Sequence, residues 1–289
     1  VYPVAVISIA GYPIVTAKSL FSYSVGISVF LQVFFLPVLG AIADYTHLKK
    51  AFMAVFCYLG AFGCVLLYFA QGDLYLFGSI AFILANLSAG ASIVFFNSFL
   101  NDISTEDRRD RVSSWSFAVG YASATITLIL SFILLLNASR LGITTEYAVR
   151  ICLLASGLWW AGFSIISFLL LKSRQPLRTP PEGKSIISAG LREVIDTFKE
   201  LFRLKHTLKF LIAYLIYNDG IQTVITMAGV FITQELFIAK GLPDDRTVLI
   251  TAILVSQVVA IFGELILERV SRATSTKTAI LISLAIWSA

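Results

Sequence analysis

Long apolar runs separated by short polar segments constrain the fold of this chain more than any other feature. A helix needs about 20 apolar residues to cross a hydrocarbon core of roughly 30 Å, and in lipid its backbone must satisfy its own hydrogen bonds. Only 13% of the 289 residues are charged, against about 25% in soluble domains. The sequence therefore predicts an all-α, multi-pass transmembrane helix bundle. The complete runs are residues 20–43, 51–70, 74–100, 112–136, 148–171, 207–237 and 246–267.

The chain begins and ends in further apolar stretches. Residues 1–15 are apolar but short and contain Pro3 and Pro13. We expect them to form the second half of a spanning helix, with an outer loop as the alternative. A last span starts at Thr278. We therefore expect a fragment of a longer protein, with nine spanning segments when the two partial ones are counted.

Basic residues concentrate in segments that lie on one side of the membrane. The polar segments at 44–50, 101–111, 172–206 and 268–277, together with Lys209, hold 17 of the 22 Lys and Arg residues. Cytoplasmic loops carry such an excess, so we expect these segments in the cytoplasm. Membrane topology then accounts for the net charge of +5, and no nucleic-acid partner is expected.

One polar segment, residues 172–206, is much longer than the others. In its second part, Ile186 to Leu204, apolar residues recur at helical spacing among charged ones. This pattern predicts an amphipathic helix that lies at the membrane surface.

The order of six spans, a basic cytoplasmic linker and further spans resembles the major facilitator superfamily, whose transporters have two six-helix halves. The resemblance implies an N-terminal half at residues 1–171, a linker at 172–206 and the start of a C-terminal half at 207–289. About helices 1 to 9 of 12 would then be present.

A loop motif follows the run at 20–43, with Gly40, Asp44, Lys49 and Lys50 in order. It resembles the loop motif of the same superfamily, except that Tyr45 stands where a basic residue usually follows the acid. Gly40 permits close helix packing, and Asp44 can accept hydrogen bonds from a helix N-terminus or pair with a cation. We expect a gating latch; the alternative is a positive-inside loop with a chance acid. A faint second copy runs from Gly263 to Arg269.

A polar cluster interrupts the apolar run at 207–237. An acid there costs roughly 2.5–3.5 kcal/mol on insertion scales, and Asn-Asp-Gly favours a turn, which predicts a helix break at Gly220. Asp219 lies roughly 18 Å from the cytoplasmic end, near the midplane, and Gln32 and Gln257 lie roughly 15 Å from theirs. The cluster comprises Asn218, Asp219, Gly220, Gln222 and Thr223.

We interpret the cluster, with Gln32 and Gln257, as a substrate-binding site on a gating helix. Asp219 would bind a substrate ammonium or a coupling proton, and the amide side chains would orient the solute. The alternative is that Asp219 hydrogen-bonds another helix and only stabilises packing. Glu264 lies three residues from the cytoplasmic end of the run at 246–267, where it can snorkel, so we expect a structural or gating role for it.

Several strings narrow the resemblance to one branch of the superfamily. They are Asn97 to Asp102, Asp107 to Ser114 leading into Gly120-Tyr121, Trp159-Trp160, and Tyr217 to Thr223. Together they resemble the vacuole-effluxer, autophagy-related family over nearly the whole chain. One departure is that Ala122 to Thr125 replaces a stretch that tends to be Gly-rich. The resemblance implies export of small solutes, with amino acids from the vacuole as the best-known case.

The function expected is secondary transport of small solutes by alternating access, in contact with the lipid bilayer and with a proton as a candidate coupling ion. The host membrane would be the plasma membrane in a prokaryote and the vacuolar membrane in a eukaryote. No cofactor, metal or enzymatic activity is expected, because no catalytic set is visible and the three Cys residues show no metal-ligand spacing. The alternative is a non-transporting sensor or scaffold whose linker helix binds a partner.

Overall fold

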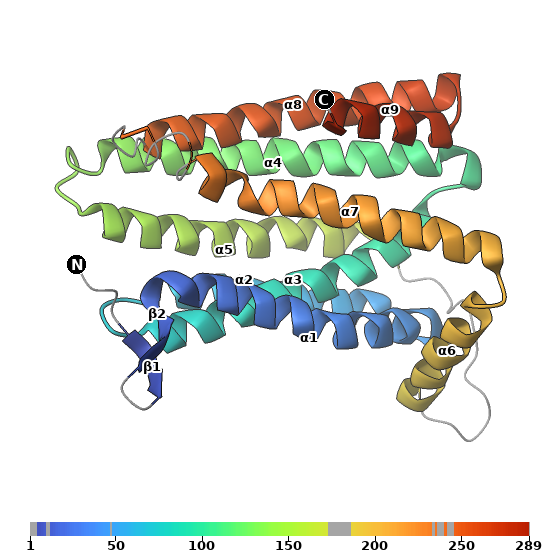
Figure 1. The fold of residues 1–289 in the computed structure, drawn as a ribbon, viewed down its shortest axis with the longest axis horizontal. Coiled ribbons are helices and arrows are strands. Elements are labelled where there is room, and N and C mark those ends of the chain that lie inside the picture. The colour runs from blue at the N-terminus through green and yellow to red at the C-terminus, as the bar shows by residue number, and fades with distance from the viewer. Residues whose placement is uncertain are drawn as a thin grey trace. The chain divides into compact units, whose positions relative to one another are not determined.

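In the computed structural model, the described residues from 17 onward lie mainly in helices. The structure describes residues 5–9, 12–46, 48–172, 186–232, 235, 240–241 and 246–288. Figure 1 labels the helices and strands along the chain. The helices are α1 (Ala17–Tyr45), α2 (Lys49–Leu67), α3 (Tyr75–Ile103), α4 (Arg109–Asn137), α5 (Thr145–Leu170), α6 (Ile186–Leu201), α7 (Lys205–Phe231), α8 (Arg246–Ala273) and α9 (Thr276–Ser288), with a 3₁₀ turn at Glu106–Arg108.

The multi-pass prediction is confirmed. Among the described residues, six helices are long and apolar enough to cross a membrane, and Thr276–Trp287 is a shorter apolar helix. The six are Ser19–Asp44, Lys49–Leu67, Tyr75–Ile103, Glu106–Asn137, Thr145–Leu170 and Ile250–Ala273. α7 is not among them, since Asn218 and Asp219 reduce the apolar character of its middle.

The helix predicted for residues 1–15 is wrong. Two antiparallel strands, β1 (Ala5–Ile9) and β2 (Tyr12–Thr16), occupy most of this stretch, with Ala5 opposite Thr16 and Ile9 opposite Tyr12. Pro13 would remove a hydrogen bond from a helix interior, and the Val, Ile and Tyr residues favour extended backbone. Apolar composition was a sufficient signal for the long runs but not for this short one.

The break predicted at Gly220 is also wrong. α7 is continuous from Lys205 to Phe231, so the Asn218-Asp219-Gly220 triplet is helical. Each residue of a helix gains a backbone hydrogen bond, and an interior glycine costs only about 1 kcal/mol relative to alanine. Local turn preference is therefore outweighed by the long apolar helix on both sides.

The chain forms two compact units. The first unit is Val1–Ile103 with Leu134–Asp196, and the second unit is Ser104–Ile133 with Thr197–Ala289. The second unit thus contains most of α4 together with α7, α8 and α9. The division into two sequence halves at 171 and 207 stays a prediction.

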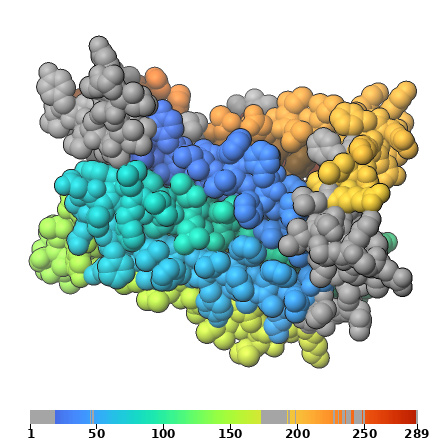
Figure 2. Space-filling view, turned by 90° about the horizontal axis from the view of Figure 1, so that it is seen from below, coloured from blue at the N-terminus to red at the C-terminus, as the bar shows by residue number. Residues whose placement is uncertain are grey.

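The core of the first unit lies where α3 packs on α1 and α2. Phe95 is fully buried, and its ring stacks on Phe52 and Phe56 with centroid separations of 5.5 and 6.0 Å. Figure 2 shows α1 (blue) lying directly against α2 and α3 (lighter blue to cyan). Large apolar side chains such as Phe30 and Phe34 stay 63% and 60% exposed on the outside, as a lipid-facing surface requires.

Small residues let the helices of the first unit approach closely. A Cβ on Gly63 of α2 would lie 2.9 Å from the backbone nitrogen of Ala85 in α3. A Cβ on Gly60 would overlap the Trp160 ring of α5, and one on Gly157 would lie 2.8 Å from the Ala61 carbonyl oxygen. Van der Waals contact between small residues is the main source of helix association in lipid, so these glycines fix α2 between its neighbours.

Candidate functional site

The α7 residues predicted to bind substrate lie on a helix surface in the second unit. The side chains of Asp219, Gln222 and Thr223 are exposed, and Asn218 is half-buried. Asp219 makes no hydrogen bond or ion pair with the residues that the structure describes. An exposed acid without a partner on an apolar helix can act on a solute or a proton. Because α7 is an unbroken helix, the helix itself positions these side chains, and no backbone break contributes to the site.

Gln32 belongs to the first unit, where α3 fixes its side chain. Its Nε2 donates to the backbone carbonyl of Asn86 at 3.1 Å, and a Cβ on Gly90 would lie 2.9 Å from its amide. Asn86 Nδ2 donates to Ser28 Oγ at 2.6 Å, and Ser28 donates to the Val25 carbonyl. Ser28 is fully buried. This polar network joins α1 to α3 near the middle of both helices.

Gln257 lies on α8 in the second unit. Its Oε1 is buried, and no described residue donates a hydrogen bond to it. A buried acceptor without a donor costs about 1–3 kcal/mol, so this position is open to a ligand or water donor. Of the predicted substrate residues, Gln32 thus lies in the first unit and the α7 residues and Gln257 lie in the second.

The loop motif is anchored differently from the expectation. Lys49 Nζ lies 3.5 Å from Asp102 Oδ2 at the end of α3, and both side chains are more than nine-tenths buried. Lys50 Nζ donates to the Leu171 carbonyl at 2.8 Å, just after α5. Asp44 makes no hydrogen bond or ion pair with described residues, and a Cβ on Gly40 would be in ordinary contact with Val94. The basic pair therefore ties the start of α2 to α3 and α5.

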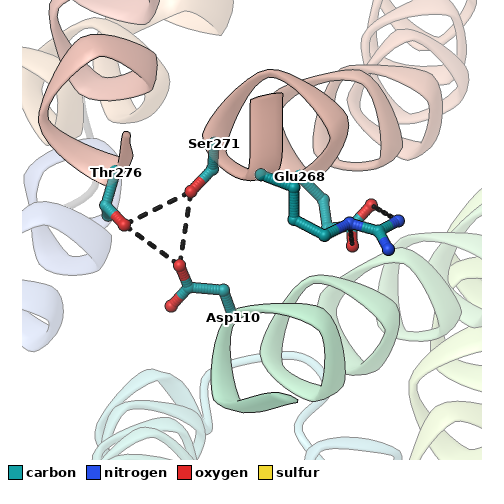
Figure 3. A network of polar contacts seen from close by, with 5 residues as sticks. Asp110, Glu268, Ser271 and Thr276 are labelled. Carbon is teal, nitrogen blue, oxygen red and sulfur yellow. Dashed lines mark hydrogen bonds and ion pairs between the residues drawn. The ribbon is translucent and has the colours of Figure 1, made fainter. Parts of the chain in front are cut away.

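A second polar network lies where α4 begins and α8 ends (Figure 3). The Asp110 carboxylate accepts hydrogen bonds from Thr276 at 3.0 Å and from Ser271 at 3.3 Å, and the two hydroxyl oxygens are 3.3 Å apart. One turn earlier on α8, Glu268 is only 5% exposed and forms an ion pair with Arg272, with Nε and Oε1 2.7 Å apart. Glu268 belongs to the faint second copy of the loop motif.

A cluster of aromatic residues and one arginine lies in the first unit, where α2 ends and α5 begins. The Arg150 guanidinium donates to Gln71 and lies 5.8 and 5.2 Å from the ring centroids of Tyr68 and Tyr147. The hydrogen bond between the two phenols raises the pKa of Tyr68. This cluster connects the C-terminal end of α2 to the start of α5.

Sequence reasoning missed the partners in these networks. Asp102 was visible as a charged residue at the end of an apolar run, but its pairing with Lys49 depends on how α2 and α3 are rotated. Asn86 is one amide within an apolar run, and its position in the sequence does not show which helix it faces. Asp110 was seen only as part of an Arg-rich string.

The fold and these networks define an integral membrane protein with several helical spans, polar networks between its helices and charged clusters at the helix ends. The chain belongs to the vacuole effluxer Atg22-like family, whose model matches residues 4–289. This confirms the resemblance seen in the sequence.

Named relatives agree with this assignment. The chain is 27% identical over 267 residues to an uncharacterized MFS-type transporter, YxiO, of Bacillus subtilis, covering 92% of this chain and 60% of the relative. It is 28% identical over 294 residues to autophagy-related protein 22 of Coccidioides immitis, covering 81% of this chain and 48% of that protein. The chain thus spans about half to three-fifths of the length of these relatives. No solved structure matches it.

Proposed function

We propose that the chain is part of a secondary transporter that exports small solutes, amino acids among them, by alternating access. Family membership and a relative named as an MFS-type transporter support the transport class. The name of the family supports export. In such transporters the solute binds near the midplane while the two halves rock around it.

The observation that carries the solute site is Asp219. It is an exposed carboxylate in the middle of the long, largely apolar helix α7, with Gln222 and Thr223 also exposed on the following turn. A carboxylate attracts the ammonium group that all amino acids share, and amide and hydroxyl groups can bind the rest of a small polar solute. Gln257, with its buried acceptor, is a further contact in the second unit.

The test replaces Asp219 by asparagine in the full-length protein and measures amino-acid transport in liposomes. Asp219→Asn keeps the shape of the side chain and removes its charge, so transport should fall by about tenfold or more while membrane insertion is unchanged. Asp196→Asn, an exposed acid on α6, is the matched control and should transport normally. Wild-type transport by Asp219→Asn would refute this assignment.

A second candidate function rests on α6. The predicted amphipathic helix is present over Ile186–Leu201, and exposed apolar side chains such as Ile195 and Phe202 suit a partner-binding helix. A scaffold or sensor would lose its cytoplasmic partner when residues 186–204 are deleted, whereas a transporter would keep solute binding. A thermal-shift screen with amino acids separates the two, because a ligand that binds the native state raises its stability.

A further inference from the structure

Four polar side chains share one face of α8. Gln257, Glu264, Glu268 and Ser271 follow one another at intervals of seven, four and three residues, a spacing that places them on the same side of a helix. At 1.5 Å per residue the stripe extends roughly 21 Å, from the charged end of α8 toward the middle of the span. Polar groups are costly in lipid, so four of them on one face of a spanning helix indicate a use.

Two residues of α4, in the second unit, lie beside this stripe. Asp110, in the first turn of α4, accepts a hydrogen bond from Ser271. Eleven residues further along α4, the Tyr121 phenol is close enough to Glu264 to interact electrostatically. The first contact lies near the end of α8 and the second lies seven residues before it, so the two helices are antiparallel. Tyr121 and Asp110 thus face the stripe at two levels.

Glu264 is the unpaired acid of the stripe. It is half-buried within the candidate span Ile250–Ala273 and makes no hydrogen bond or ion pair with the residues that the structure describes. α8 continues to Ala273, six residues beyond the predicted end, so Glu264 lies roughly 13 Å from the end of the helix. It is therefore deeper along α8 than the sequence indicated. Glu268, by contrast, is balanced by Arg272.

Among the described groups on α4 and α9, no cation balances the charge of an ionised Glu264 within the span. Two carboxylates four residues apart repel each other when both are ionised, and only Glu268 has a cation beside it. α4 is hydrogen-bonded to α8 and α9 packs on it, and the charged and titratable groups of these two helices are Arg109, Asp110, Arg111 and Tyr121 on α4 and Lys277 on α9. All except Tyr121 lie at helix ends, so no cation on these helices accompanies Glu264 within the span.

We propose that Glu264 binds and releases the proton that couples solute movement in this protein, with the stripe on α8 as the proton's path between the cytoplasmic end and Gln257. This inference rests on the proposed transport function. The carboxylate takes a proton from water at the cytoplasmic end and becomes a neutral acid. The neutral side chain can be enclosed between α4 and α8, and the proton is then released to water, which restores the charged carboxylate.

The test uses the full-length protein in liposomes with labelled leucine as the probe. Glu264→Gln should lose leucine accumulation driven by a pH gradient by about tenfold or more, yet keep leucine–leucine exchange within about twofold of wild type. Glu146→Gln, an exposed acid at the start of α5, should behave as wild type in both assays. Accumulation by Glu264→Gln at the wild-type level, or loss of exchange as well as accumulation, would overturn the proposal.

An infrared measurement separates this inference from the transport proposal. The wild-type protein should show a carboxylic-acid C=O band whose intensity changes with pH and which is absent in Glu264→Gln. If neither assay detects leucine transport by the wild type, leucine is excluded as a solute, and the band alone then decides whether Glu264 binds a proton. Absence of a titrating band would overturn the assignment of Glu264 whatever the transport result.

Discussion

Lys49 and Asp102 are the most deeply buried ion pair among the described residues, with side chains 6% and 9% exposed. Removing one member of such a pair leaves an uncompensated charge in a low-dielectric site. Lys49→Ala should therefore destabilise the protein by about 3–5 kcal/mol, seen as a lower thermal midpoint in detergent. Lys209→Ala, an exposed lysine on α7, should leave the midpoint unchanged.

A double replacement distinguishes the charge effect from lost packing. Lys49→Met with Asp102→Leu removes both charges and keeps most of the side-chain volume, so it should recover most of the stability lost in Lys49→Ala. If the double variant is as unstable as the single one, the pair acts through contacts other than its charges.

Individual polar residues were easier to find in the sequence than their partners. Gln32 was recognisable because an amide inside an apolar run is costly, and the structure gives it a partner, the Asn86 carbonyl. That partner depends on the rotation of α3 about its axis, which composition does not encode. The binding role of Gln32 stays a prediction, although the hydrogen bond shows that its amide also joins α1 to α3.

At the scale of elements, Gly63 on α2 is a sensitive position in the helix packing. A Cβ there meets the backbone of α3, with Ala85 N at 2.9 Å and the Ala81 carbonyl oxygen at 3.0 Å, and backbone atoms cannot rotate away. Gly63→Ala should lower stability by about 1–3 kcal/mol despite its better helix propensity. Gly162→Ala on α5, where a Cβ meets no atom within 4 Å, should be neutral or stabilising. Thermal midpoints of the two variants give the comparison, and equal midpoints would contradict it.

The helices themselves were largely predictable, and the two errors have different causes. A run such as 74–100 is long enough that only a helix satisfies its backbone in lipid, and α3 follows it closely. Residues 1–15 are too short for that argument, and their prolines and β-branched residues form strands instead. At Gly220 a break was predicted where the helix continues, because a local turn preference was given more weight than the long helix around it.

At the scale of the whole molecule, α4 connects regions that the sequence assigns to different halves. It follows three spans of the predicted N-terminal half, yet its first turn is hydrogen-bonded to the junction of α8 and α9 through Asp110, Ser271 and Thr276. Conformational change in transporters of this class moves one half against the other. Hydrogen bonds from hydroxyl groups to a carboxylate contribute about 1.5–3 kcal/mol each, so the proposed transport motion would have to replace them with bonds to water if it separated α4 from this junction.

The orientation of the chain in the membrane decides which ends of the helices face the cytoplasm. The excess of Lys and Arg predicts that the segments containing Thr105 and Ser275 face the cytoplasm and that Ser139, between α4 and α5, faces the other side. All three side chains are exposed, and the native cysteines Cys57, Cys64 and Cys152 can be replaced by alanine. In intact cells that carry the full-length protein in the plasma membrane, an impermeant maleimide should then label Ser139→Cys.

Under the same conditions Thr105→Cys and Ser275→Cys should react only after the membrane is permeabilised. The reverse pattern would invert the topology and place the stripe on α8 at the opposite surface, where a proton would enter from outside. Labelling of all three sites in intact cells would mean that the charged ends of α4 and α8 do not lie on the side opposite Ser139. The expected pattern instead places Asp110, Glu268 and Ser271 together at the cytoplasmic surface, as proton entry toward Glu264 from that side requires.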